Sequence, residues 1–414
     1  MNKTKHEHTE QAADLVEGPL PSTPPLKSGR AASGAMSGHV RVLCTGDFQL
    51  GKAFSTLGAS AKDFRNQLFE TAKAVLAAGD DADLVLVAGD VFDREATPTR
   101  DIENFAKVLA RCRAHVVVIA GNHDSIVSGI PGVLRAALEG LNANHVTVAT
   151  DRSPVRFDDL NVTVFPASLM TRGDLSDQWS WIPDRTNEDG HRIALMHGAI
   201  SSIQNGLIPE DVAARKDLDM VVLGDMHGPR HGDASASTLF DLETSLARRL
   251  VYAMAPESQN IKQGFIGAYT LLTLGPDIGD AELERVEVGE IRFAQRSADF
   301  AVEDDVSAVL EEALEDLSAR PPSLTSIRLE ISGTVDRQGH GELQTAINAL
   351  KAAWPLFEVL DDVAVDKGDA EDDEGEDVDD PVFAALQASM VTAGAAPDVM
   401  ARAKELYRLN RGWA

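Results

Sequence analysis

Five short runs rich in valine, isoleucine and leucine each end in a cluster of polar residues. The runs are Val40–Thr45, Leu84–Ala88, His115–Ala120, Ile193–Met196 and Met220–Leu223. Such runs are typical of strands that are buried on both faces of a sheet. In open α/β sheets, sites form in loops beyond the carboxyl ends of the strands, because the strands hold those loops rigidly. The pattern therefore predicts an α/β fold in which five polar clusters converge.

The polar clusters contain residues that bind hard metal ions. They are Asp47-Phe48-Gln49, Gly89-Asp90-Val91-Phe92-Asp93, Gly121-Asn122-His123-Asp124, Met196-His197-Gly198 and Gly224-Asp225-Met226-His227. Carboxylates, amide oxygens and imidazoles without a thiolate suit Mn²⁺, Mg²⁺ or Fe better than a cysteine-bound structural zinc. Two such ions about 3.5–4 Å apart clamp a phosphoryl group and generate hydroxide from water. The sequence therefore predicts a two-metal phosphoesterase site.

In order and spacing, the clusters resemble the calcineurin-like metallophosphoesterases, whose pattern is D-x-H, G-D-x-x-D, G-N-H-[DE], a lone His and G-H-x-H. The resemblance covers residues 39–290, and stretches such as LVLVAGDVFDR and VVVIAGNHDS are most similar to SbcD-type DNA repair nuclease subunits. It implies a four-layer αββα sandwich of two mixed sheets, followed by a small α/β capping domain and C-terminal helices. It also implies a DNA exo- or endonuclease that uses a hydroxide bridging two metal ions.

The resemblance assigns a role to each site residue. It places around the first ion Asp47, Gln49, Asp90 and His227, and around the second Asp90, Asn122, His197 and Asp225. Asp90 would bridge the two ions. His123 takes the position of the catalytic imidazole, and Asp93 that of the carboxylate that orients this ring and raises its basicity. Arg94 takes the position of a phosphate-binding arginine, a role suited to its fork of donors.

Two residues depart from the family pattern. Gln49 stands where D-x-H has its histidine, and Asp225 stands where G-H-x-H has its first histidine. Both replacements can still bind a metal ion, which favours a changed metal preference over decay of the site. The expected ion is then Mn²⁺, with Mg²⁺ next, rather than zinc or iron. The alternative is a catalytically weakened binding subunit.

The charge balance bears on how the chain would bind DNA. The 38 Lys and Arg residues oppose 66 Asp and Glu residues, which gives a formal net charge of −28. DNA affinity comes largely from cationic side chains that neutralise phosphates, so the isolated chain is expected to bind DNA poorly. By resemblance, an SbcC-type coiled-coil ATPase subunit supplies the missing surface, and SbcD-type subunits also form homodimers. A hydrolase of small phosphoesters, nucleotides or phosphoproteins is the alternative that fits the negative charge better.

Composition predicts two segments without a folded core. Residues 1–38 are polar and contain Pro19, Pro21, Pro24 and Pro25, which predicts a disordered segment without a signal peptide and leaves Met36 as an alternative start. Residues 366–380 are almost entirely acidic and predict a flexible linker.

Two further units follow the predicted nuclease domain at 39–290. Residues 291–365 show helical spacing at 304–317 and 343–353 and strand alternation at 326–332, and they match the capping domain in placement. Residues 381–414 show the pattern of two amphipathic helices, at the place where SbcD-type subunits bind their ATPase. Such a stripe is also typical of a helix packed on its own domain.

The remaining features concern compartment and one loop. Cys44 and Cys112 lack a C-x-x-C spacing, are expected to be buried, and are compatible with the reducing cytoplasm. The chain has no apolar run near the roughly 20 residues needed to cross a bilayer, so no membrane association is expected. The stretch from Tyr252 to Glu257 resembles the Y-x-G-x-P-E loop of nuclease-branch members, but Met254 replaces a glycine that would permit a positive φ.

Overall fold

The computed structural model describes residues 38–186, 190–203, 206–229, 238–277, 280–317 and 320–366. The predicted N-terminal segment, the acidic linker and the C-terminal helices lie outside these residues, except for Gly38 and Asp366.

The first sheet has six strands in the order β11-β10-β1-β2-β3-β4. The strands are β1 Val40–Thr45, β2 Leu84–Val87, β3 His115–Val118, β4 Val146–Val148, β10 Ala268–Leu274 and β11 Ala281–Glu287. Strand β1 runs parallel to β2 but antiparallel to β10, so the sheet is mixed.

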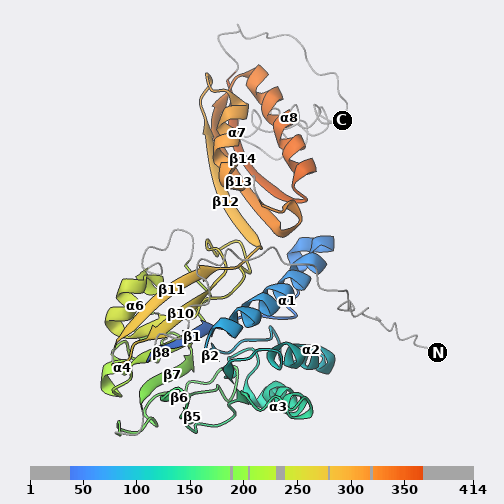
Figure 1. The fold of residues 1–414 in the computed structure, drawn as a ribbon. Coiled ribbons are helices and arrows are strands. Elements are labelled where there is room, and N and C mark those ends of the chain that lie inside the picture. The colour runs from blue at the N-terminus through green and yellow to red at the C-terminus, as the bar shows by residue number, and fades with distance from the viewer. Residues whose placement is uncertain are drawn as a thin grey trace, which may run out of the picture. The chain divides into compact units, whose positions relative to one another are not determined.

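Three helices cover one face of this sheet (Figure 1). They are α1 Ala61–Ala78, α2 Thr99–Leu109 and α3 Ile130–Gly140. Helix α1 buries Phe64, Leu68, Ala72 and Val75 at spacings of three and four residues, which places them on one side of the helix. That side packs on β-sheet residues such as Val85, whose neighbours along β2 point to the opposite face.

The second sheet has five strands in the order β5-β6-β7-β8-β9. The strands are β5 Val155–Phe157, β6 Val162–Pro166, β7 His191–His197, β8 Met220–Gly224 and β9 Leu250–Tyr252. Strand β5 is antiparallel to β6, and the other pairs are parallel. This sheet is therefore also mixed.

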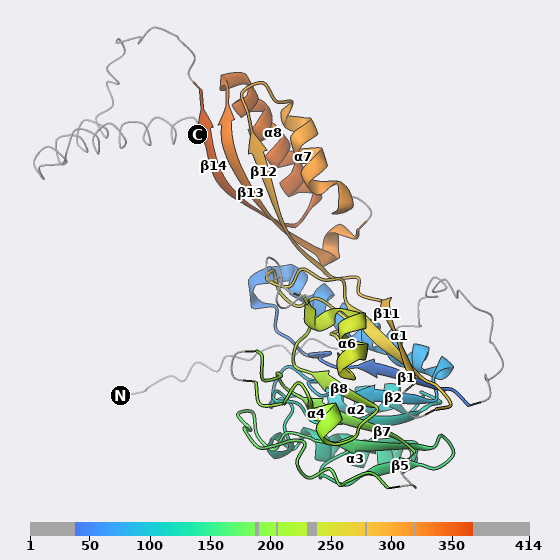
Figure 2. The ribbon, with the colours of Figure 1, turned by 90° about the vertical axis from the view of Figure 1, so that its left-hand side faces the viewer.

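The two sheets pack face to face (Figure 2). Leu84, Leu86 and Val117 of the first sheet share a buried core with Ile193 and Val222 of the second. Alternate residues of β7 and β8 enter another core, on the outer face of the second sheet. Helix α4 Val212–Arg215 lies on this side, with Val212 and Ala213 in that core, and helix α6 Leu242–Arg248 contacts β9 and β11. The three cores separate four layers, which confirms the αββα sandwich of two mixed sheets.

The α/β unit predicted at 291–365 contains a three-stranded sheet in the order β12-β13-β14. Its elements are β12 Arg292–Phe300, α7 Val306–Leu314, β13 Thr325–Val335, α8 Arg337–Ala353 and β14 Leu356–Val365. It has a core of its own, in which Leu329 and Ile331 meet Leu343 and Ile347. The two helices and the strand expected there are present, while the boundaries of the five predicted segments stay predictions.

The five apolar runs correspond to β1, β2, β3, β7 and β8, with ends that differ by no more than two residues. Both cysteines are buried, as expected. None of the helices in the described ranges combines the length and the apolar character that a membrane crossing requires.

Candidate metal centre

The candidate site residues lie just beyond strand ends of both sheets. Asp47 follows β1, Asp90 follows β2 and Asn122 follows β3, while His197 ends β7 and Asp225 follows β8. These strands are parallel within each sheet, so their carboxyl ends lie at the same edge. The loops therefore bring the predicted clusters together, as is usual for sites in α/β sheets.

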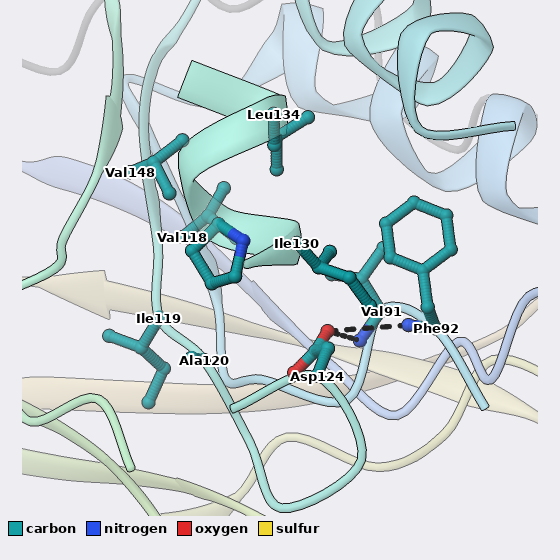
Figure 3. Close-up of a pocket in the computed structure, with 10 residues that line it drawn as sticks. Val91, Phe92, Val118, Ile119, Ala120, Asp124, Ile130, Leu134 and Val148 are labelled. Carbon is teal, nitrogen blue, oxygen red and sulfur yellow. Dashed lines mark hydrogen bonds between the residues drawn. The ribbon is translucent and has the colours of Figure 1, made fainter. Parts of the chain in front are cut away.

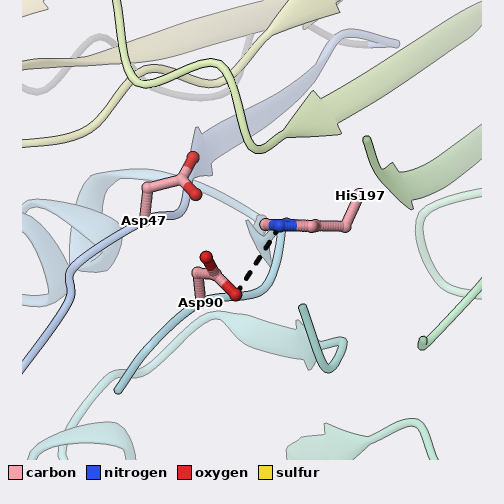
Figure 4. Close-up of side chains that lie close together, drawn as sticks. All are labelled: Asp47, Asp90 and His197. Atoms are coloured by element: carbon pink, nitrogen blue, oxygen red, sulfur yellow. Dashed lines mark ion pairs between the residues drawn. The ribbon is translucent and has the colours of Figure 1, made fainter. Parts of the chain in front are cut away.

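The centre of the site is formed by Asp47, Asp90 and His197 (Figure 4). All three side chains are buried, and each offers one ligand atom within 4.8 Å of the others. The Nε2 atom of His197 lies 3.6 Å from Asp90 Oδ1 and 3.9 Å from Asp225 Oδ1. Ligand atoms that share an ion at bond lengths of about 2.0–2.3 Å stand roughly 3–4 Å apart. The spaces between these atoms therefore suit a divalent ion.

The ring of His197 is held in one orientation from two sides. Its Nδ1 atom donates to the Ala88 carbonyl at 2.7 Å, so the neutral form of the ring carries its lone pair on Nε2. The side chain of Gln178 makes two hydrogen bonds with the backbone of His197. Gln178 Nε2 donates to the His197 carbonyl, and Gln178 Oε1 accepts from the His197 N–H. His197 thus presents a metal-competent nitrogen to the carboxylates.

Three buried acceptor atoms at the site have no hydrogen-bond partner among the described residues. They are His197 Nε2, Asn122 Oδ1 and Gln49 Oε1. Leaving a buried polar atom unsatisfied costs about 1–3 kcal/mol. A cation would satisfy all three atoms, and carboxylate, amide and imidazole donors are those that hard or borderline divalent ions accept. The residues present therefore fit the metal centre that the sequence predicts.

Asp90 lies between the other candidate ligands. Its Oδ2 atom accepts from Gln49 Nε2 at 2.8 Å, and its Oδ1 atom accepts from the His123 N–H at 2.9 Å. The Asp47 carboxylate accepts from the backbone N–H of Asp225 at 3.1 Å. His227 completes the group, with Nε2 at 3.8 Å from Asp47 Oδ1. Asn122 Nδ2 lies 3.5 Å from Asp225 Oδ1, so the seven predicted ligands lie close together.

Electrostatics at the site favour added positive charge. Burial raises the pKa of Asp47 well above its usual range, and the carboxylates of Asp90 and Asp225 raise it further. Burial opposes protonation of His197, but Asp90, Asp47 and Asp225 outweigh it and raise the pKa of that imidazole to about 9. Burial lowers the pKa of His227 to about 4. A divalent ion would relieve the repulsion among the carboxylates.

Four candidate ligands have left-handed backbone conformations. The φ angle is +51° at Asp47, Gln49 and Asp90, and +85° at Asp225. Such a conformation costs roughly 1–2 kcal/mol for a residue with a Cβ atom. Residues in sparsely populated backbone regions gather at functional sites, where surrounding contacts hold them. The contacts around the site therefore hold its backbone in conformations that such residues rarely adopt.

His123 lies beside the cluster with one ring nitrogen held. Its Nδ1 atom contacts the backbone carbonyl of Asp93 at 2.5 Å, and its Nε2 atom lies 4.0 Å from Asp90 Oδ2. The Asp93 carboxylate instead pairs with Lys52 Nζ at 3.1 Å. The family resemblance predicts that the Asp93 carboxylate orients the ring, whereas in the structure the Asp93 carbonyl contacts it. A carbonyl accepts the Nδ1 hydrogen equally well and fixes the same tautomer.

Arg94 lies at the exposed edge of the site. Its Nη2 atom donates to the Gly51 carbonyl at 3.0 Å. The phosphate-binding role that the resemblance gives to Arg94 stays a prediction.

Asp124 has a positioning role that its motif alone does not reveal (Figure 3). Its buried carboxylate accepts from the N–H groups of Gly121 at 2.8 Å and Val91 at 2.7 Å, and more weakly from those of Asp90 and Phe92. Burial and the nearby Asp90 carboxylate raise the pKa of Asp124 to about 6. Asp124 ties the loop after β2 to the loop after β3.

Two buried glutamines in the segment after β9 also hold the site. Gln259 Nε2 donates to the Asp47 carbonyl at 2.8 Å, and Gln263 Nε2 contacts His227 Nδ1 at 3.0 Å. The sequence signals neither residue, because a polar residue in an irregular segment shows no periodicity. In the same segment Met254 has a φ of +63°, so the loop keeps the conformation that glycine would permit.

The family model described as calcineurin-like phosphoesterase matches residues 40–229. The SbcD subunits of the nuclease SbcCD from Escherichia coli strain K12 and from Escherichia coli O157:H7 are each 37% identical to the chain over 94 residues. These matches span 22% of this chain and 22% of each relative.

A solved structure, TT1561 of Thermus thermophilus, aligns with 60% of this chain and 99% of its own chain. Its sequence identity to this chain is 12% and the TM-score is 0.35. Through the match over residues 40–229 and the motifs that meet at the site, this part of the chain is similar to the calcineurin-like phosphoesterase family.

Proposed function

We propose that the chain is a two-metal-dependent phosphodiesterase that cleaves DNA as the nuclease subunit of an SbcCD-like repair complex. The observation that carries this proposal is the buried cluster of Asp47, Asp90 and His197, with unpartnered acceptors on Gln49 and Asn122 beside it. A centre rich in oxygen ligands that holds two divalent ions suits a phosphodiester substrate.

The proposed ions are Mn²⁺ or, second, Mg²⁺. Asp47, Gln49, Asp90 and His227 would hold one ion, and Asp90, Asn122, His197 and Asp225 the other. When bound, the ions supply positive charge for the phosphate oxygens and lower the pKa of a water molecule. The carboxylate at Asp225 adds negative charge where the family pattern has a neutral imidazole, which favours harder ions.

His123 is the proposed catalytic residue. Its Nδ1 atom is held by the Asp93 carbonyl, so Nε2 is the nitrogen left for a substrate oxygen. The side chain is 26% exposed, whereas that of Asp90 is 2% exposed, so a substrate can reach the ring from outside. A ring in this position can stabilise charge on the phosphorus oxygens or protonate the leaving oxygen.

DNA and a partner subunit are proposed from the relatives and the charge. The two relatives that match over 94 residues are named as subunits of a nuclease. A net charge of −28 requires a cationic surface from elsewhere, which an SbcC-type ATPase would supply. The homodimer and the cytoplasmic location expected from the sequence stay predictions.

A hydrolase of small phosphoesters, nucleotides or phosphoproteins is the second candidate. The negative net charge favours it, because a small substrate does not need an extended cationic surface.

Hydrolysis assays test the proposal directly. The purified protein is assayed with Mn²⁺, Mg²⁺ or chelator on bis-p-nitrophenyl phosphate and on labelled linear DNA. We expect cleavage that requires Mn²⁺, and a loss of about 10²–10⁴-fold in His123→Ala because the general acid is gone. The control is His115→Gln, which changes a surface histidine that pairs with Asp159.

Three results would separate the candidates. Cleavage of both substrates supports the nuclease, and cleavage of the small diester alone supports the second candidate or a missing partner subunit. Bound Mn²⁺ without turnover of either substrate would contradict the catalytic proposal for the isolated chain.

A further inference from the structure

We infer that the two ion positions have unequal affinity, and that Gln263 weakens the first one by turning His227 into a hydrogen-bond donor. This inference rests on the proposed function, because it concerns the same dinuclear centre.

The Gln263 amide has one orientation that fits its neighbours. The backbone N–H of Gln259 lies 2.7 Å from Gln263 Oε1. A backbone N–H can only donate, so the oxygen of the amide must face it. The amide nitrogen of Gln263 therefore points to His227 Nδ1, at 3.0 Å. This orientation follows from the hydrogen-bond network, which is how such amides are assigned.

The orientation of this amide sets the tautomer of His227. An amide nitrogen can only donate, so His227 Nδ1 accepts this hydrogen bond and carries no hydrogen. A neutral imidazole carries one hydrogen, which is then on Nε2. Nε2 is the atom that faces the site, at 3.8 Å from Asp47 Oδ1. A ring nitrogen that carries a hydrogen has no lone pair for a metal ion.

His197, at the second position, has the opposite tautomer. Its Nδ1 atom faces the Ala88 carbonyl at 2.7 Å, and a carbonyl can only accept. In the neutral ring the hydrogen is therefore on Nδ1, and the buried Nε2 atom carries the lone pair. A backbone carbonyl on the outer nitrogen is the usual partner of a metal-binding histidine. The two histidines of the site thus differ in what they offer an ion.

Gln49 also belongs to the first ion position. Its amide nitrogen is committed to Asp90 Oδ2 at 2.8 Å, so the neutral oxygen is what remains for an ion. A neutral amide is a weaker ligand than the imidazole of the family pattern. The first position therefore combines one weak ligand with one blocked ligand. The second position has an open lone pair on His197, a free Asn122 oxygen and the Asp225 carboxylate.

Titration of the metal-free protein with Mn²⁺ tests this inference. Calorimetry gives the affinities, and electron paramagnetic resonance distinguishes an isolated Mn²⁺ ion from a spin-coupled pair. In the wild type we expect one tight equivalent and a second that is at least about 10-fold weaker, the scale of effects from residues behind metal ligands. The spectrum at one equivalent should be that of an isolated ion.

The decisive variant is Gln263→Glu, which keeps the shape of the side chain. A carboxylate there can still accept from the Gln259 N–H, but it also accepts from His227 Nδ1 and so frees Nε2. We expect the second equivalent to bind about 10-fold more tightly than in the wild type. Asn260→Asp is the charge control, because this exposed residue of the same segment accepts from the Lys262 N–H and does not touch His227.

A second variant keeps the test decisive if Gln263→Glu fails to fold. Gln49→His restores the imidazole of the family pattern, and it should also tighten the second equivalent. Equal affinities in the wild type, or a Gln263→Glu protein indistinguishable from Asn260→Asp, would overturn the inference and leave the proposed function intact. No Mn²⁺ binding at all would overturn both.

Discussion

At the scale of single residues, the site depends on acceptors that hold backbone N–H groups of the ligand loops. Asp124 does this for the loops after β2 and β3, through N–H groups of Gly121, Val91, Phe92 and Asp90. A carboxylate offers acceptors on both oxygens, whereas an amide offers one oxygen and a group that donates. The position therefore requires a carboxylate, although it touches no ion in the proposed centre.

Asp124→Asn should lower the free energy of unfolding by about 2–4 kcal/mol, because an NH₂ group would face backbone N–H groups in a buried place. Urea unfolding monitored by circular dichroism measures the change. The matched control is Asp159→Asn, at an exposed carboxylate that pairs with His115, where we expect less than about 0.5 kcal/mol. A variant as stable as this control would mean that the Asp124 contacts do not hold the loops.

The identities of the candidate ligands could be predicted from the sequence, because each lies in a motif at a strand end. How they are oriented could not. Asp93 contacts His123 through its carbonyl, and a motif carries no information on which atom of a residue is used. The glutamines that hold the candidate ligands lie in irregular segments, away from the ligand motifs in the sequence. Only the folded structure shows their contacts, which are made by Gln178, Gln259 and Gln263.

At the scale of elements, Glu257 connects the segment after β9 with α1 and with the start of β12. Its carboxylate accepts from Thr71 Oγ1 at 2.5 Å, from the Glu290 N–H at 3.0 Å and from the Ile291 N–H at 2.8 Å. Burial raises the pKa of Glu257 to about 7, even though the hydrogen bonds from Thr71, Glu290 and Ile291 oppose the shift.

The raised pKa of Glu257 predicts a pH-dependent stability. The folded chain keeps a proton on Glu257 up to about pH 7, whereas the unfolded chain releases it near its ordinary pKa of 4.5. Stability from this group is therefore present at low pH and is lost as the pH rises from about 4.5 to 7, by about 3 kcal/mol.

Unfolding of wild type and Glu257→Gln between pH 4.5 and 8 in chelator checks this. The wild-type free energy of unfolding should fall relative to that of the variant as the pH rises. Asp124 also titrates in this range, but it is present in both proteins and cancels in the difference. Parallel pH profiles for the two proteins would contradict the prediction.

The strands and helices that the sequence predicts have a strong local sequence pattern. The buried runs are continuous where a strand is covered on both faces, as in β2, and α8 shows helical spacing. Strands β12 and β14 are not among the predicted elements, because charged residues such as Arg296 and Asp361 interrupt their apolar positions. Pairing with β13 in a sheet overrides this weak local signal.

At the scale of the whole molecule, metal binding should couple to stability. Asp47, Asp90 and Asp225 bring three carboxylates together in the folded chain, and the unfolded chain has no such site. An ion whose free concentration is about 100 times its dissociation constant would add roughly 2.7 kcal/mol to the free energy of unfolding. For a protein of this size we expect Mn²⁺ to raise Tm by about 3–4 °C.

Differential scanning fluorimetry with Mn²⁺ and with excess chelator measures this shift. Asp90→Asn removes the carboxylate shared by both proposed ion positions, and it should abolish most of the shift. Asp159→Asn, which changes the charge by the same amount at an exposed position, should keep it. An equal shift in both variants would mean that Mn²⁺ acts elsewhere on this acidic chain.

The left-handed backbone at four ligands also limits how the site can evolve. Away from glycine, aspartate, asparagine and histidine are the residues that adopt positive φ most readily, and β-branched residues do so at high cost. Asp47, Asp90 and Asp225 belong to the favoured types, and Gln49 is one base change away from histidine, as is Asp225. Point mutations can therefore exchange one metal-binding side chain for another while the chain path stays the same. The metal ion that the proposed centre prefers can therefore change by single substitutions without a change of fold.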